Sequence, residues 1–218
     1  MRMKACFIAV GLFAIAGCGW LDQHLAAPVT AKSWVAPYTG FVDKTAAIVV
    51  YAPAATLDEY SGAREEISTF VATQMREHMA ATRLLAPRDV IYWQDETLNW
   101  QNLSARDVGR HFGVDRVLFI EVLDYSMRRP MGVSNLQGRL RAQCKIYETQ
   151  ENAPKPDDNG HLAAVWTGLI DAAWPPAKPL DPTQTNEAAV RLRTLESFAD
   201  TLVRCFYVAR EGSPAVRG

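Results

Sequence analysis

One stretch, residues 117–125, constrains the fold more than any other part of this 218-residue chain. Its sequence, VLFIEVLDY, is apolar on both faces of an extended strand. A strand with one solvated face alternates apolar and polar residues instead, so this strand is expected at the centre of a sheet that is covered on both sides. Ser104 can cap a short helix that Gly113 ends, and that helix would lead directly into the strand.

The chain before this strand predicts two further strands and one long helix. The β-branched run at 46–51 and the sequence DVIYW at 89–93 each favour a short strand. Thr56 and Glu59 have the spacing of a capping box, so a helix is expected to begin there and to run to about Arg83.

The chain after the central strand predicts two more strands and a closing helix. Residues 138–149 alternate between apolar and polar side chains, and 162–173 form a second extended run. An amphipathic helix is expected from about Asn186. The predicted fold class is therefore α/β, a mixed sheet with a three-stranded antiparallel meander and helices packed on it.

The N-terminus has the features of a secretory signal peptide over residues 1–17. Arg2 and Lys4 precede an apolar run at 7–16 that is too short to span a bilayer. Cys18 follows at once, and the sequence Ile-Ala-Gly-Cys resembles a bacterial lipobox, in which the Cys18 thiol is alkylated by a diacylglyceryl group. Lipidation of Cys18 would anchor the chain to a membrane. Gly19 stands where lipoproteins kept in the inner membrane often carry Asp, which favours the outer membrane facing the periplasm.

The rest of the chain is expected to form one domain behind a tether. Residues 18–45 mix Pro, Gly and isolated aromatics without a period and predict a lipidated tether. A single α/β domain is expected over 46–210 and a flexible tail over 211–218. The aromatic side chains of the tether either dock a partner or pack on the domain: Trp20, Trp34, Tyr38 and Phe41.

Composition and motifs give little support to catalysis, cofactors or nucleic acid. With 23 basic and 24 acidic side chains, the chain lacks the positive excess of nucleic-acid-binding proteins. No metal-binding, phosphate-binding or nucleophile motif is present, so no catalytic residue, metal or cofactor is expected. Asp107 and His111 are expected to form a surface ion pair. Glu121 is expected to be partly buried and to pair with Arg139 or Arg141.

Residues 105–125, a short helix followed by Gly-Val-Asp and an apolar strand, resemble envelope proteins of the CsgG, TolB amino-terminal and LpoB type and related transport-auxiliary lipoproteins. The sequence AVWTG at 164–168 is similar to a strand of such proteins that carries a Trp. The resemblance covers about residues 46–205. It implies an anticodon-binding-like, TolB amino-terminal-like fold that serves as an assembly or adaptor module without catalytic residues.

Two functional hypotheses follow. The first is a non-enzymatic, lipid-anchored accessory protein that presents its domain to a protein partner in envelope assembly, secretion or transport. The second is a lipid- or polysaccharide-binding lipoprotein that uses Trp93, Trp100 and Trp166 as apolar contacts. Cys144 and Cys205 are the free thiols left after processing, and they form a candidate disulfide because the compartment is oxidising. The partner and the oligomeric state cannot be read from the sequence.

Overall fold

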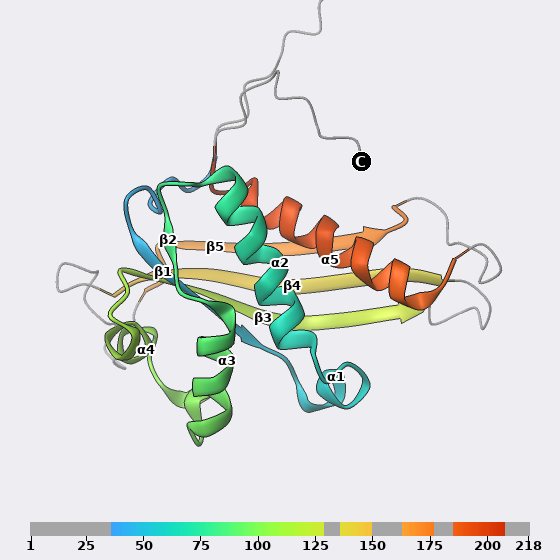
Figure 1. Cartoon of the computed structure of the whole chain (residues 1–218), viewed down its shortest axis with the longest axis horizontal. Coiled ribbons are helices and arrows are strands. Elements are labelled where there is room, and N and C mark those ends of the chain that lie inside the picture. The colour runs from blue at the N-terminus through green and yellow to red at the C-terminus, as the bar shows by residue number, and fades with distance from the viewer. Residues whose placement is uncertain (1–35, 129–135, 150–162, 177–184, 208–218) are drawn as a thin grey trace, which may run out of the picture. The chain divides into compact units, whose positions relative to one another are not determined.

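The computed structural model describes residues 36–128, 136–149, 163–176 and 185–207, and all of them belong to one compact unit. Its centre is a five-stranded mixed sheet with the strand order β2-β1-β3-β4-β5 (Figure 1). The strands are β1 (Thr45–Tyr51), β2 (Arg83–Leu84), β3 (Arg116–Arg128), β4 (Leu136–Glu148) and β5 (Trp166–Trp174). β1 runs parallel to β2 and β3, whereas β3, β4 and β5 form an antiparallel meander. The predicted fold class is confirmed.

β3 is the central strand, as the sequence predicts. It pairs with β1 on one side and with β4 on the other, and Val117, Leu118 and Ile120 are all buried. Apolar residues on both faces are needed here because helices cover both faces of the sheet at the start of this strand. Farther along, a bulge near Leu123 shifts the register with β4, and the second face of the sheet becomes partly exposed.

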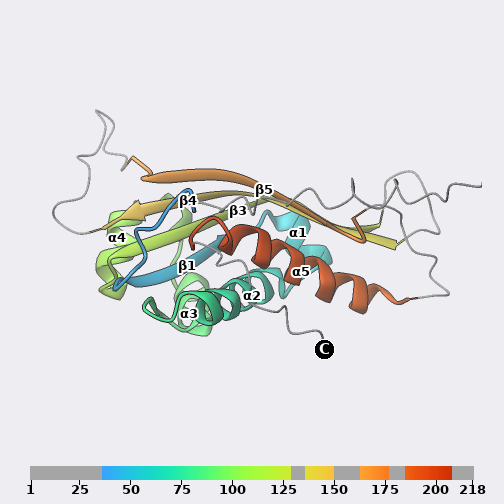
Figure 2. The ribbon, with the colours of Figure 1, turned by 90° about the horizontal axis from the view of Figure 1, so that it is seen from above.

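Two long helices, α2 (Ala63–His78) and α5 (Glu187–Val203), cover one face of the sheet (Figure 2). The short helix α1 (Ala54–Glu59) precedes α2. The main core lies under α2 and α5 and contains Ile48, Ile67, Leu118, Leu140, Ile146 and Phe198. α5 begins where the sequence predicts, and Asn186 caps it, because its side-chain oxygen accepts a hydrogen bond from the Ala189 N–H.

The opposite face of β1 and β3 carries a smaller core under α3 (Pro87–Glu96), the 3-10 helix η1 (Trp100–Asn102) and α4 (Ala105–Phe112). The prediction of a strand at 89–93 is wrong, because these residues lie in α3. Pro87 occupies the first turn of the helix, where its fixed φ is favourable. Val90 and Trp93, three residues apart, both pack against this smaller core, which is a helical spacing.

The predicted helix from Thr56 to Arg83 is interrupted and shorter. α1 begins after Pro53 with no side-chain cap, so the capping box of Thr56 and Glu59 is not formed. The chain turns at Tyr60, which is buried against Tyr125 with ring centroids 4.8 Å apart. Burial of this tyrosine in the core separates α1 from α2.

The packed structure begins upstream of residue 46, where the sequence placed the start of the domain. Phe41 is fully buried and packs against Phe206, with ring centroids 5.2 Å apart. Arg116 donates hydrogen bonds to the Tyr38 hydroxyl (3.0 Å) and to the Gly40 carbonyl (3.2 Å). The sequence left open whether the aromatic residues of the tether dock a partner or pack on the domain. Tyr38 and Phe41 pack on the domain. The signal peptide, Cys18, Trp20, Trp34 and the tail at 211–218 lie outside the described residues.

Candidate functional site

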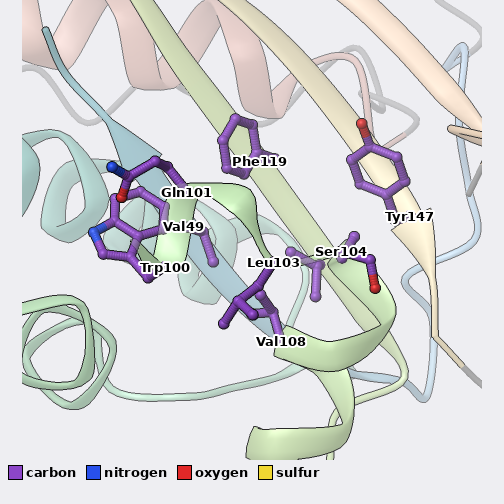
Figure 3. Close-up of a pocket in the computed structure, with 10 residues that line it drawn as sticks. Val49, Trp100, Gln101, Leu103, Ser104, Val108, Phe119 and Tyr147 are labelled. Atoms are coloured by element: carbon purple, nitrogen blue, oxygen red, sulfur yellow. The ribbon is translucent and has the colours of Figure 1, made fainter. Parts of the chain in front are cut away.

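A pocket of about 180 Å³ opens on the face of the sheet that carries η1 and α4 (Figure 3). We call it the sheet pocket. The strands contribute Val49, Val117, Phe119 and Tyr147, and the other wall comes from Trp100, Gln101, Leu103, Ser104, Ala105 and Val108. Its lining is therefore mostly apolar, and Figure 3 shows Trp100 and Tyr147 on opposite sides of it.

Three residues fix where η1 and α4, which form one wall of the sheet pocket, begin and end. Asn99 has a left-handed backbone conformation (φ 56°) that turns the chain into η1. The Ser104 hydroxyl oxygen accepts a hydrogen bond from the Asp107 N–H and caps α4. Gly113, with φ 63°, ends α4 in the conformation that glycine favours. Both predicted signals of this helix, the cap at Ser104 and the stop at Gly113, are confirmed.

Gly109 allows α4 to lie close to the end of β4. A Cβ atom at this position would collide with the side chain of Thr149. The Thr149 hydroxyl also donates a hydrogen bond to the Val114 carbonyl. The close approach of α4 to the end of β4 therefore depends on the absence of a side chain at residue 109.

A second hollow, an open groove of about 690 Å³, lies between α3 and α4. We call it the helix groove. Leu103 lines both hollows, and Tyr92 and Trp93 line the groove with it. Large apolar side chains are exposed here, with exposed fractions of 64% for Tyr92, 93% for Leu98 and 43% for Leu103. The two hollows and these exposed side chains form one surface over α3, η1 and α4.

The three tryptophans predicted as apolar contacts do not share one site. Trp93 and Trp100 lie together, with ring centroids 6.2 Å apart, and line the helix groove and the sheet pocket respectively. The ring of Trp93 also stacks on His111 at 5.4 Å and meets Phe112 edge-on at 5.2 Å. Trp166 packs instead against the main core on the other face of the sheet.

The expected ion pair between Asp107 and His111 is replaced by other contacts. Asp107 accepts a hydrogen bond from the Ser104 hydroxyl at 2.6 Å and forms an ion pair with Arg110 at 3.4 Å. His111 stacks on Trp93. Within the described ranges, no three His, Cys, Asp or Glu side chains are grouped so that they could hold a metal ion.

Arg139 does not form the predicted ion pair with Glu121 and contacts other carboxylates instead. Its guanidinium donates two hydrogen bonds to Asp171, at 3.0 and 2.6 Å, and lies 3.9 Å from Asp124. The hydrogen bonds from Arg139 lower the pKa of the Asp171 carboxyl. The register between β3 and β4 shifts between Val122 and Asp124, so Asp124 lies opposite Arg141, whereas Glu121 lies opposite Gln143 and not opposite either predicted arginine.

The candidate disulfide between Cys144 and Cys205 is not formed in the structure, in which both residues are free thiols. Cys144 is buried on β4 and Cys205 is half-buried just after α5. Burial raises the pKa of the Cys144 thiol. The bond between Cys144 and Cys205 stays a prediction.

Comparisons with known proteins assign no family to the chain and find solved structures of low sequence identity. No family model and no curated protein matches the sequence. A single-residue variant of the PelC dodecamer from Paraburkholderia phytofirmans matches with a TM-score of 0.42 and 15% identity, over 79% of this chain and 96% of that one. Lipoprotein GNA1162 from Neisseria meningitidis matches with a TM-score of 0.42 and 14% identity, over 67% and 89% of the two chains. A minor lipoprotein from Acinetobacter baumannii has a TM-score of 0.37 and 13% identity, over 75% and 90%.

None of the helices in the described ranges combines the length and the hydropathy needed to cross a bilayer.

Proposed function

We propose that this chain is a non-enzymatic, lipid-anchored accessory protein of the bacterial cell envelope that presents its α/β domain to a protein partner. The partner would act in envelope assembly, secretion or transport. Two features support the proposal: the lipobox sequence that ends at Cys18, and the apolar surface over α3, η1 and α4. The finer likeness to proteins of the CsgG, TolB amino-terminal and LpoB type remains a prediction, as does the outer-membrane location.

The exposed side chains around the sheet pocket are the observation that carries the proposal. Single exposed apolar residues are common on protein surfaces, but a continuous apolar patch beside a hollow marks an interaction site. Leu103 joins the sheet pocket to the helix groove, and Tyr92 extends the patch along α3. A protein partner that inserts one apolar side chain into the sheet pocket would bury this surface.

The size of the sheet pocket favours a protein partner over a lipid. Its volume of about 180 Å³ is smaller than the roughly 300–1,000 Å³ of most small-molecule sites. The helix groove has a volume of about 690 Å³, but it is open to solvent and does not enclose a ligand. The sheet pocket suits a single aromatic or aliphatic side chain better than an acyl chain.

The packing of the tryptophans argues against the polysaccharide alternative. A sugar ring needs a free aromatic face, but the Trp93 ring already contacts Trp100, His111 and Phe112. Trp100 is buried and Trp166 belongs to the other face of the sheet. These three rings therefore do not form a stacking platform for a sugar.

Photocrosslinking in intact cells tests the proposed surface. A photoreactive amino acid replaces Leu103 in the full-length chain, and the matched control replaces Thr73, an exposed residue of α2 on the other side of the sheet. We expect a discrete protein adduct from position 103 that is absent from position 73. Equal adduct patterns at both positions, no protein adduct at 103, or an adduct with lipid or polysaccharide would contradict the proposal.

A further inference from the structure

β5 ends the sheet with an edge that no strand in the described part of the chain pairs with. The strand is nine residues long, WTGLIDAAW, and it contains no Pro, Lys or Arg. Natural proteins protect such edges with Lys, Pro, bulges or short strands. The one charged residue of β5, Asp171, is bound to Arg139 on the neighbouring strand, so it does not protect the outer edge.

We propose that the edge of β5 pairs in antiparallel fashion with β5 of a second copy of this chain, about a two-fold axis at Ile170. The two sheets then form one continuous sheet, and the unpaired backbone groups of both edges are satisfied. This interface is separate from the surface over α3, η1 and α4, and it does not depend on the partner proposed for that surface.

On one face of β5, residues of similar size lie at equal distances on either side of Ile170, which favours this register. Trp166 lies four residues before Ile170 and Trp174 four residues after it. Trp166 of one copy therefore lies opposite Trp174 of the second copy. Gly168 and Ala172, both small, are likewise opposite each other. All five residues share the face of β5 that packs towards α5, because side chains on a strand alternate between faces. Aromatic cross-strand pairs stabilise a sheet by about 0.2–1 kcal/mol each.

The opposite face supports the same register through charge. With the axis at Ile170, Leu169 faces Asp171 of the second copy, and no two like charges meet. A shift of the axis by one residue to Asp171 would place the two Asp171 carboxylates opposite each other, which is unfavourable. The charge pattern therefore favours a two-fold axis at Ile170 over one at Asp171.

The position of α5 is compatible with this pairing. α5 packs against both β4 and β5, and neighbouring strands lie about 4.8 Å apart. The two copies of α5 would then be separated by about two strand spacings, roughly 10 Å. Packed helices are about 8–10 Å apart, so the two helices would form a continuous second layer over the joined sheet.

A charge substitution on the exposed face of β5 tests the pairing. In the full-length chain extracted in detergent, Leu169→Asp places one carboxylate opposite Asp171 of the other copy, and this contact occurs twice in each dimer. The matched control, Leu123→Asp, introduces the same charge on the same face but on β3. The exposed fractions of the two leucines are 49% and 50%. Leu169→Lys places a positive charge against Asp171 instead.

Sedimentation velocity, corrected for bound detergent, measures the mass of each variant. We expect a dimer for the wild-type chain, Leu123→Asp and Leu169→Lys, and at least a tenfold weaker association for Leu169→Asp. A wild-type chain that is monomeric at tens of micromolar would overturn the proposal. An assembly that Leu169→Asp and Leu123→Asp affect equally would overturn it too. The melting temperature of each variant shows that the monomer fold is retained. If Leu169→Asp does not fold, a folded Leu169→Lys chain that is monomeric where Leu123→Asp is a dimer would overturn the proposed pairing with Asp171.

Discussion

Replacement of Phe41 by alanine tests whether the segment before β1 belongs to the domain. Phe41 is fully buried, and its ring meets those of Tyr38 and Phe206 at centroid distances of 5.3 and 5.2 Å. Arg116 holds the same segment through hydrogen bonds to Tyr38 and Gly40. Phe41 therefore fills space between the N-terminal segment and the end of α5.

The expected loss of stability is large. Truncation of a buried Phe to Ala lowers the free energy of unfolding by about 3–5 kcal/mol, since it removes apolar contacts and leaves a cavity. The edge-to-face contacts with Tyr38 and Phe206 place Phe41→Ala in the upper part of that range. Domains of this kind are stable by only about 5–15 kcal/mol, so the variant should unfold at a clearly lower denaturant concentration.

Urea unfolding of the full-length chain, followed by circular dichroism, measures this loss. Val42→Ala is the matched control, because Val42 is the next residue in the chain and its side chain has an exposed fraction of 57%. We expect Val42→Ala to stay within about 0.5 kcal/mol of the wild type. If Phe41→Ala and Val42→Ala unfold at the same urea concentration, residues 38–45 are a tether and the packing of Phe41 contributes nothing.

Three further predictions concern other parts of the chain. Gly109→Ala should lower the free energy of unfolding by about 1–3 kcal/mol, because the added Cβ collides with Thr149 and overpacking outweighs the better helix propensity of Ala; a more stable variant in thermal unfolding would refute this. Cys18→Ser should release the protein to the soluble fraction or block its processing, and unchanged membrane retention with unchanged mass would exclude lipidation at this residue. Arg139→Ala should raise the pKa of Asp171 towards its ordinary value, because the hydrogen bonds that favour the charged carboxylate are lost. The stabilisation from this pair is present above the unfolded-state pKa of Asp171 and is lost as the pH falls through the lowered folded-state pKa; an NMR titration of the Asp171 carboxyl that is the same in both proteins would contradict the assignment.

The sequence predicted those elements whose signals are local. β3 is apolar on both faces because both faces are covered, and α4 has its cap at Ser104 and its stop at Gly113 in adjacent sequence. The alternation along β4 was equally readable, since Leu140 and Ile146 face the core while Arg139 does not. In these segments, local preference and tertiary packing agree.

Other features depend on contacts that no local pattern contains. The sequence VIYW in α3 has strand-forming residues, but Pro87 and the smaller core beneath α3 favour a helix. Phe41 becomes part of the core only because Phe206, far away in the sequence, lies beside it. The local sign of the buried Phe41 was an isolated apolar side chain, which also occurs in tethers and loops.

The sheet pocket could not have been found from the sequence. Its walls come from β1, β3, β4 and the segment from η1 to α4, which are brought together only by the order of strands in the sheet. The signal that was available is Trp100 and Leu103, two of the large apolar residues in the mostly polar stretch at 94–107, and both line the pocket. Such residues are equally common in buried turns, so their position at the pocket had to be seen.

The intact mass of the protein extracted from cell membranes tests the lipid-anchored adaptor most directly. We predict a chain that begins at Cys18 and carries a diacylglyceryl group, with a further acyl chain on its α-amine. Alkaline hydrolysis should remove the ester-linked chains and lower the mass accordingly. A mass equal to that of all 218 residues, or of a processed chain without lipid, would contradict the anchor on which the proposed function rests.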